Sequence, residues 1–410
     1  MTARLFGDPP MKSEHPAIER AGPCVGLMVL DLSTMVSGPM GGQIFGDLGA
    51  DVIKLEAIGG DTMREVFPHH KGLGAFFSQY NRSKRSIAVD LKTEEGREIA
   101  RELALRADVL IENFRPGVAE RLGLGYEELK AQNRSLVYLS VKGFGEDGPD
   151  KDQPAYDMVI QGLTGFMAVQ GAGGLPMPIR NSVADKVAAI SGVMSALAAL
   201  WAREKNGGKG QKVVVKMLDA WAAFVSQEEM KNHTFVDSDA VAPIPRDMYR
   251  VFETRDGHVF GLIIQDNQFR GICAVLNRPD LLTDPRFAKP GSRLQNMSLL
   301  NDELAPSIAA MTTADFIAGA KMHEVPMGPV NTLEQFFDHP QAKHNRIFQE
   351  IEDAEFGRMR GLNFFAAFSD TPLSLTRRAP MLGEQTDSIL RTTGRADDEI
   401  KSLRETKVVR

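Results

Sequence analysis

The sequence contains only two cysteines, Cys24 and Cys273, in 410 residues. Two thiols so far apart exclude a disulfide framework and are typical of a protein in a reducing compartment. The eight histidines form no His-Glu-x-x-His pattern, which excludes that class of zinc site. We therefore expect a cytoplasmic protein without a dedicated metal.

An excess of positive charge is also missing. The chain has 48 Lys and Arg residues against 54 Asp and Glu residues, a net charge of −6. This balance argues against a general binder of nucleic acids or of anionic membranes, because both need a basic surface. No apolar run approaches the ~18 residues that cross a bilayer. Residues 1–23 are polar and contain acids and prolines, so they are expected to be an extension and not a signal peptide.

Three common motifs are absent as well. No Gly-x-Gly-x-x-Gly follows the first predicted strand, and no Gly-x-x-x-x-Gly-Lys-Ser/Thr phosphate loop occurs. The chain also lacks the Gly-x-Ser-x-Gly elbow of serine hydrolases. Nicotinamide-dependent, P-loop and serine-hydrolase functions therefore lose the motifs that would best support them.

Short apolar runs alternate with helical patterns in the first half of the chain. Such runs predict buried strands, which we expect at residues 26–33, 50–57, 85–91, 108–114, 135–144 and 211–218. One helix between them, at residues 94–107, has Thr93 as its expected N-cap, and Asp185 is the expected cap of a long apolar helix. Strands separated by helices predict an α/β fold with a parallel sheet, which binds ligands outside the carboxyl ends of its strands.

The pattern changes near residue 222. Two alternating strands flank Asp256-Gly257, which predicts a hairpin, and a short amphipathic helix follows. We expect a small α+β domain at residues 222–330. It interrupts a large domain. The first part of that domain is residues 24–221, and residues 331–410 complete it.

Asp157 is the only acidic residue between Asp152 and Asp185, and Met158-Val159-Ile160 follow it directly. Burial disfavours the charged form of a carboxyl group unless donors or cations compensate. Asp157 is therefore either a catalytic group or a structural acid, for example a helix cap. The residues alone favour the structural interpretation.

Three groups that contain basic side chains border predicted strands at the same edge of the inferred sheet. The cluster at 81–86 and Lys92 lie before and after the strand at 85–91, Arg115 and Arg121 follow the strand tip at Asn113 and Phe114, and Lys142 ends the fifth strand. Guanidinium groups and an aromatic face suit a nucleotide phosphate and base. The alternative is a surface turn whose arginines pair with Glu120 or Glu127, and composition alone favours it.

Several longer segments resemble the class III CoA-transferases, which include formyl-CoA and carnitine CoA-transferases and are related to the α-methylacyl-CoA racemases. The most specific are "LGADVIKLE" (48–56), "ENFRPG" (112–117), "PAYDMVIQGLTG" (154–165) and "VPMGPVNTLEQ" (325–335). The resemblance spans roughly residues 24–408. It implies a Rossmann-like large domain with a small inserted domain, and two ring-like subunits interlocked as a homodimer.

The resemblance also implies the activity of an acyl-CoA:carboxylate CoA-transferase with Asp157 as its nucleophile. In that mechanism the carboxylate attacks the thioester, and a mixed anhydride and then an aspartyl-CoA thioester form. The substrates are acyl-CoA and small carboxylic acids. No metal, nicotinamide, nucleic acid or membrane is expected. Amides near Gly38 and Gly143–Gly145 are the expected oxyanion donors.

Further positions carry over from the family one by one. Those that match contacts to the adenine and phosphates of CoA are Lys92, Asn113, Phe114, Arg115, Arg121 and Lys142; those that match the loop near the pantetheine and acyl end are Met35, Val36 and Ser37. This resemblance reverses the preference for a surface turn at residues 113–126.

Two departures from the family pattern bear on the substrate. Val36 stands where formyl- and oxalate-type members have glutamine, which favours an acid less polar than oxalate. Tyr156 replaces the histidine of racemases, and a racemase needs two positioned acid/base groups. An α-methylacyl-CoA racemase is therefore the second hypothesis, and a CoA-binding protein without catalysis is the third.

Overall fold

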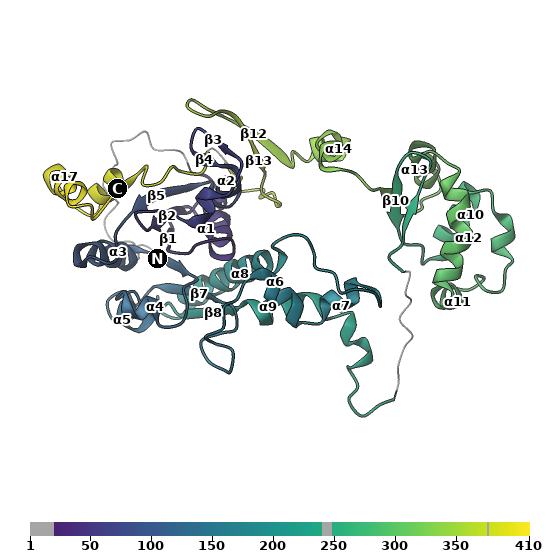
Figure 1. The fold of residues 1–410 in the computed structure, drawn as a ribbon, viewed down its shortest axis with the longest axis horizontal. Coiled ribbons are helices and arrows are strands. Elements are labelled where there is room, and N and C mark those ends of the chain that lie inside the picture. The colour runs from purple at the N-terminus through teal and green to yellow at the C-terminus, as the bar shows by residue number, and fades with distance from the viewer. Residues whose placement is uncertain (1–19, 240–247, 375–376) are drawn as a thin grey trace, which may run out of the picture. The chain divides into compact units, whose positions relative to one another are not determined.

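The computed structural model describes residues 20–239, 248–374 and 377–410. Contacts divide the chain into two compact units, one of residues up to Ser226 together with Arg346–Arg410, the other of Gln227–Asn345 (Figure 1). Folding domains bounded at residues 222 and 330 stay a prediction. Most of the expected N-terminal extension, residues 1–19, lies outside the described part of the chain.

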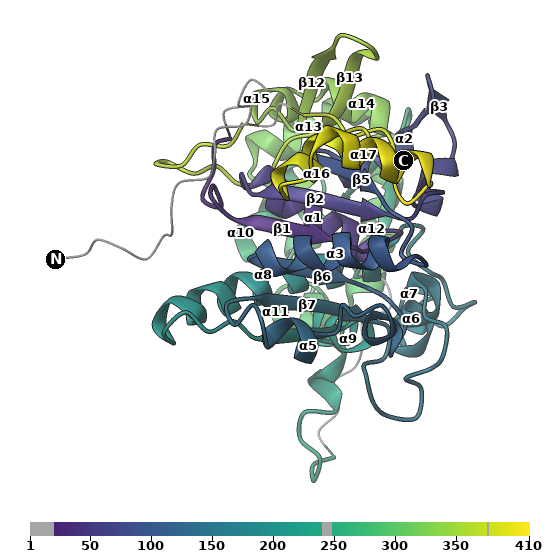
Figure 2. The ribbon, with the colours of Figure 1, turned by 90° about the vertical axis from the view of Figure 1, so that its left-hand side faces the viewer.

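The first unit is built on a six-stranded parallel sheet in the order β5-β2-β1-β6-β7-β8 (Figures 1 and 2). The strands are β1 (Met28–Asp31), β2 (Asp51–Glu56), β5 (Lys84–Ala88), β6 (Val109–Glu112), β7 (Val137–Lys142) and β8 (Lys212–Lys216). Each falls within or close to an expected run, so the predicted α/β class with a parallel sheet is confirmed. The last run was expected to extend to residue 218, but a helix already begins at Met217.

Apolar side chains on both faces of the sheet are buried, because successive residues of a strand point to opposite faces. Val29 belongs to the core under α1 (Ser37–Asp47), α8 (Val183–Lys205) and α9 (Met217–Val225). Leu30 belongs to the opposite core, with α3 (Glu94–Arg106), α5 (Tyr126–Lys130), α16 (Thr386–Thr392) and α17 (Asp397–Glu405) (Figure 2). The last helices of the chain thus cover a sheet made by residues 28–216.

Two predicted helix caps have different outcomes. Thr93 caps α3 as expected, because its hydroxyl accepts a hydrogen bond from the amide of Gly96 at 3.0 Å. The cap expected at Asp185 is wrong: α8 begins at Val183, so Asp185 lies in its first turn. The side chain of Asp157, distant in the chain, accepts from the Asp185 amide instead.

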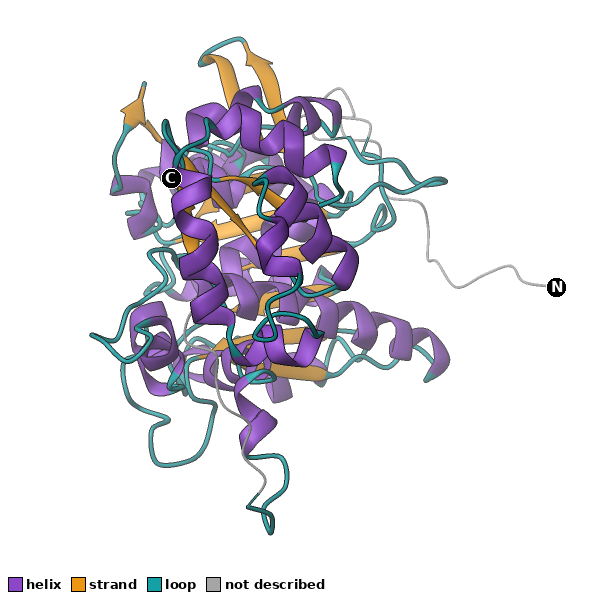
Figure 3. Ribbon diagram, turned by 90° about the vertical axis from the view of Figure 1, so that its right-hand side faces the viewer, coloured by secondary structure: helices purple, strands orange, loops and turns teal. Residues whose placement is uncertain are grey.

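The second unit has a three-stranded antiparallel sheet in the order β11-β10-β9. β9 (Val251–Glu253) and β10 (His258–Gly261) form the hairpin predicted around Asp256-Gly257, and β11 is Met327–Pro329. Its core includes Phe252, Phe269 and Phe316. The helices of this unit (Figure 3) are η2 (Glu229–Asn232), α10 (Asp266–Val275), η3 (Pro279–Leu282), α11 (Pro290–Gln295), α12 (Met297–Ala309), α13 (Thr313–Met322), α14 (Leu333–Asp338) and α15 (Pro340–His344).

Shorter elements complete the first unit. They are η1 (Thr62–Glu65), β3 (His69–His70), β4 (Leu73–Gly74), α2 (Ala75–Asn81), α4 (Val118–Arg121), α6 (Asp157–Leu163), α7 (Phe166–Gln170), β12 (Phe348–Asp353) and β13 (Gly357–Leu362).

Candidate active site

Asp157 is the first residue of α6, and its side chain lies inside the protein. The residue is 4% exposed, whereas its neighbours Tyr156 and Met158 are 64% and 56% exposed. Residues 157, 160 and 161 share one helix face by their spacing and are all buried, since α6 packs on α8 and α9. The amphipathic pattern of this short helix therefore places an acid, and not an apolar residue, at the buried start of its inner face.

Each carboxylate oxygen of Asp157 has a hydrogen-bond donor. The side-chain amide of Gln161 donates to Oδ1, and the backbone amide of Asp185 donates to Oδ2 at 3.1 Å. Asp185 lies in the first turn of α8, where free amides and the helix dipole favour a negative charge. The salt bridges of the described residues include none to Asp157, so neutral donors hold this buried carboxylate.

A second carboxyl group lies next to the first. Burial, and then the charge of Asp157, raise the pKa of Asp185 to about 6, while a hydrogen bond from Ser37 lowers it. Burial, and then the charge of Asp185, also raise the pKa of the Tyr80 phenol. Ser37, predicted to lie near the acyl end of the substrate, is thus brought to the same helix end as Asp157.

The loop after β1, which leads into α1 at Ser37, is held in place by buried charges. Met35 has a φ of 71°, the left-handed region that few non-glycine residues adopt. Its amide donates to Oδ1 of Asp61 at 3.3 Å. Lys54 pairs with the other oxygen of Asp61 at 3.2 Å and donates to the carbonyl of Ser33 at 2.8 Å. One ion pair therefore binds the loop at two points.

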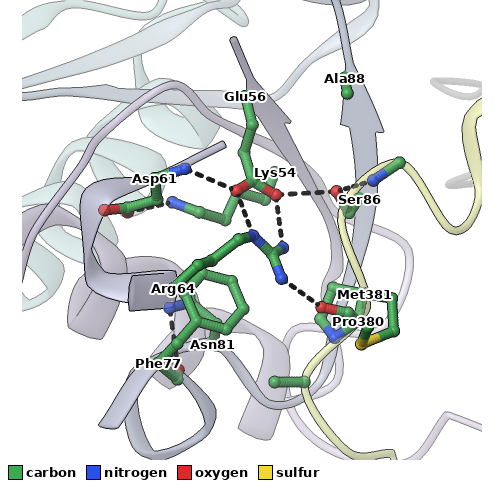
Figure 4. Close-up of polar contacts among 12 residues, drawn as sticks. Lys54, Glu56, Asp61, Arg64, Phe77, Asn81, Ser86, Ala88, Pro380 and Met381 are labelled. Carbon is green, nitrogen blue, oxygen red and sulfur yellow. Dashed lines mark hydrogen bonds and ion pairs between the residues drawn. The ribbon is translucent and has the colours of Figure 1, made fainter. Parts of the chain in front are cut away.

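A further ion pair supports Asp61. Glu56 accepts two hydrogen bonds from Arg64 at 2.7 Å, and it also accepts from the amide of Asp61 and the hydroxyl of Ser86 (Figure 4). Arg64 lies over the ring of Phe77. The sequence patterns above did not predict this network. Its signal was present, because Lys54 and Glu56 interrupt the apolar run of an otherwise buried strand.

Another lysine, Lys84 at the start of β5, is buried. Lys84 donates to Asp31, to the carbonyl of Pro39 and to Asn81, each at 2.7 Å. Burial lowers the pKa of Lys84 to about 8. Lys84 belongs to the basic cluster at 81–86, whose charges suggest an anion site, but its ammonium group lies inside the protein.

Two of the predicted CoA contacts hold the protein together in this structure. Asn113 accepts from the amide of Thr34 at 2.9 Å and donates to its carbonyl at 2.8 Å, so it joins the end of β6 to the loop after β1. Lys142 is buried and donates to both oxygens of Glu112 at 2.9 Å and to the carbonyl of Phe114 at 2.7 Å. Both residues position loops at the carboxyl ends of strands.

The remaining predicted contacts differ in exposure. Lys92, Arg115 and Arg121 are exposed, Met35 and Phe114 are half-buried, and Val36 and Ser37 are buried. The surface-turn alternative requires ion pairs from these arginines to Glu120 or Glu127. In the described part of the chain, Arg115 and Arg121 form no such pair. Their contact with CoA stays a prediction.

A cleft of about 220 Å³ lies beside Glu112 and Lys142. Its lining includes Glu112, Gly117, Glu120, Lys142 and Lys212. Carboxylates and lysines are mixed there, so the cleft is not a simple basic pocket. Asp157 is not among its lining residues.

Comparisons with known proteins extend over most of the chain. The sequence model of CoA-transferase family III matches residues 25–386. A succinate–glutarate CoA-transferase of Agrobacterium fabrum is 32% identical, over 90% of this chain and 96% of its own length. An acetyl-CoA:oxalate CoA-transferase of Acetobacter aceti is 35% identical, over 78% of this chain and 84% of its own. The crystal structure of a CaiB/BaiF family protein from Brucella suis has a TM-score of 0.80 at 34% identity, over 91% of this chain and 100% of that one.

The buried pair of Lys54 and Asp61 generates the first prediction. Asp61→Asn keeps the acceptor for the amide of Met35 but leaves the charge of Lys54 without this partner. We expect a loss of about 2–4 kcal/mol in the free energy of unfolding, measured by urea titration. Glu127→Gln, at the exposed pair with Lys130, is the control and should change it by less than ~0.5 kcal/mol. Equal losses in the free energy of unfolding in the two variants would contradict a stabilising role of the buried pair.

The raised pKa of Asp185 generates the second prediction. Its folded-state pKa of about 6 exceeds the usual 3.8 of an unfolded chain. Ionisation of Asp185 therefore lowers the free energy of unfolding as pH rises through about 6, and this loss is absent below pH 3.8. Asp185→Asn should therefore raise stability by about 1–2 kcal/mol at pH 8 and change it little at pH 4, as followed by thermal unfolding.

The matched control is Asp219→Asn, at the same first-turn position of α9 but 64% exposed in its side chain. It should alter stability little at either pH. A shift for Asp185→Asn that is the same at both pH values would show that ionisation is not its cause.

Proposed function

The chain belongs to CoA-transferase family III, and from this we propose that it transfers CoA through a covalent intermediate on the side chain of Asp157. As a member of the family it is a transferase, and it acts on acyl-CoA thioesters and carboxylic acids. The observation that carries the proposal is the burial of Asp157 at 4% exposure, with a neutral donor on each carboxylate oxygen.

The arrangement suits a carboxylate nucleophile. Neutral donors orient the group without a cation that would hold its charge too tightly to attack. Burial keeps water from the anhydride and thioester intermediates, whose hydrolysis would waste the thioester's free energy. Asp157 attacks the thioester carbonyl and expels CoA thiolate, and the thiolate then attacks the activated aspartyl carbon and expels the donor acid. The acceptor carboxylate reverses both steps with a new acyl group.

We assign CoA binding to the predicted residues in two ways. Lys92, Arg115 and Arg121 are exposed and free to meet phosphates of the nucleotide end. Asn113 and Lys142 act through the loops that they hold, at Thr34 and Phe114. Met35–Ser37 would then follow the pantetheine arm toward Asp157, because Ser37 bonds to Asp185 beside it.

The acids are best sought among short dicarboxylates. The relatives compared above are named for succinate, glutarate and oxalate. The buried apolar side chain of Val36, where oxalate-type members have glutamine, argues against the smallest and most polar of these. Succinyl-CoA with glutarate is therefore the first pair to test.

The racemase alternative is weaker. Tyr156 occupies the position of the racemase histidine, and its side chain points outward at 64% exposure. Among the residues that the structure describes, the hydrogen-bond partners of the Asp157 carboxylate are Gln161 and Asp185, and neither is a histidine that could exchange a proton with the α-carbon of a substrate. The non-catalytic alternative would leave the burial of a carboxylate without a purpose beyond capping α8.

An interlocked homodimer is part of the proposal. α8 is long and apolar enough to cross a membrane, but half of its apolar window is buried within the protein. Its other face exposes Ile190, Met194 and Trp201, at 48%, 65% and 64%. These residues lie four and seven positions apart, so they form one stripe. A second copy of the chain is the occupant that the family implies.

Cytoplasmic location also belongs to the proposal, supported by the two free, buried cysteines.

The catalytic role of Asp157 is tested by replacing it. We expect Asp157→Asn to lower kcat for transfer from succinyl-CoA to glutarate at least about a thousandfold, because an amide cannot form the anhydride. Intact-protein mass spectrometry should show a CoA adduct in the native enzyme and none in the variant. Asp152→Asn, an exposed acid in the preceding loop, is the control and should retain turnover. Substantial turnover by Asp157→Asn would exclude this mechanism.

The homodimer is tested by measuring its mass and by placing one charged side chain on the exposed face of α8. Light scattering should give twice the 45.0 kDa of one chain. Met194→Glu should weaken the assembly, since a charge would be buried at the interface. Met322→Glu, another exposed methionine at 78%, serves as the control. A monomer at micromolar concentration would contradict the proposal.

A further inference from the structure

Gln161 is the residue that touches Asp157 most directly. It lies one helical turn after Asp157 on α6, is completely buried, and donates a hydrogen bond from Nε2 to Oδ1 of Asp157. A buried amide costs free energy unless its groups are paired, so its partners define what it can do.

Those partners fix the orientation of the amide. Oε1 of Gln161 accepts from the amide of Ile179 at 2.9 Å, and Nε2 also faces the carbonyls of Ile179 and Asn181 at 3.3 and 3.1 Å. Exchanging the oxygen and nitrogen would place two donors together and two acceptors together. The segment at 179–181 therefore keeps the N–H of Gln161 directed at Asp157.

The two oxygens of Asp157 face different surroundings. Oδ2 accepts from the amide of Asp185, and Asp185 bonds to Ser37 in the loop assigned to the acyl end of the substrate. Oδ1 faces Gln161, which solvent does not reach. Oδ2 is thus the oxygen placed to attack, and Oδ1 stays behind as the carbonyl oxygen of the acylated side chain.

We propose that Gln161 is a catalytic residue, whose side-chain N–H stabilises the oxyanion that forms on Oδ1 of the acylated Asp157. The inference rests on the proposed function. When CoA thiolate attacks Cγ of the mixed anhydride, the carbonyl electron pair moves onto Oδ1. The electron pair then re-forms the carbonyl, and the bond from Cγ to Oδ2 breaks. The donor acid leaves, and Oδ2 becomes one of the oxygens of the donor's carboxylate. No proton is gained or lost.

The same donor serves the acceptor's attack on the aspartyl-CoA thioester, where charge again develops on Oδ1 and CoA thiolate leaves. In the first and last steps of transfer, attack occurs at the acyl carbonyl, and the oxyanion lies on the acyl group. Gln161 therefore assists only the two steps at the aspartyl carbon. This selectivity distinguishes it from a residue that merely holds α6.

The first experiment separates these steps with succinyl-CoA alone. In rapid-quench experiments, the native enzyme should release thiol and then show a CoA adduct by mass spectrometry. Gln161→Met, of similar volume, should release thiol but carry a succinyl group in place of CoA. Its kcat for transfer to glutarate should fall about 100- to 1000-fold, as for loss of an oxyanion donor, with KM changed far less. Gln170→Met, exposed on α7, is the matched control.

A second variant covers the case in which Gln161→Met does not fold. Gln161→Glu introduces a carboxyl that can donate to Oδ1 only while it is protonated. Its kcat should fall tenfold per pH unit above the pKa of that group, relative to the native enzyme and the control. A structural role alone would not produce this profile.

Three outcomes overturn the inference. They are a CoA adduct formed by Gln161→Met at the native rate, equal losses at all four steps, and a Gln161→Glu profile that parallels the native one. Failure of the proposed function is distinguishable, because it would appear as turnover by Asp157→Asn. Gln161 variants with normal adducts, together with an inactive Asp157→Asn, would remove only the present inference.

Discussion

The hydrogen bond between Oδ2 of Asp157 and the amide of Asp185 joins the start of α6 to the start of α8. α8 packs on α1, β7 and β8, so its first turn is fixed relative to the sheet. The free amides of that turn supply the positive end that a buried carboxylate needs. A helix end thus compensates a charge that the apolar surroundings of α6 would otherwise disfavour. The same contact draws a second carboxyl group, that of Asp185, into the site and raises its pKa to about 6.

The loop after β1 depends on buried ion pairs. Burying charges is costly, and such pairs contribute little net stability compared with an apolar core. Their geometry explains their presence here. Lys54 and Asp61 bind the Ser33 carbonyl and the Met35 amide, and Asn113 binds both backbone groups of Thr34. A loop held at every residue from 33 to 35 presents Val36 and Ser37 in one conformation, as a transferase that must align a thioester and a carboxylate requires.

Local patterns predicted much of the fold. The six parallel strands lie within or close to their expected runs, Thr93 caps α3, and the hairpin forms at Asp256-Gly257. Each of these depends on residues close together in the chain. The cap expected at Asp185 was wrong because the group that satisfies its amide is 28 residues away. Lys142 and Asn113 are expected to contact CoA, which stays a prediction, and the structure adds that both bond to protein groups. No local pattern predicts those partners, because they come from other strands and loops.

The sequence by itself determined the class of fold, the family and the position of the one acid in an apolar helix. Strand and helix periods and long family motifs are carried by consecutive residues, so they are readable without coordinates. Only the tertiary structure decided that Gln161 and Asp185 divide the two oxygens of Asp157 between them. It also decided that Lys54, Glu56, Asp61 and Arg64 form one network. Such contacts arise when packing of helices on a sheet brings distant groups within hydrogen-bond range, and no local pattern specifies which groups will meet.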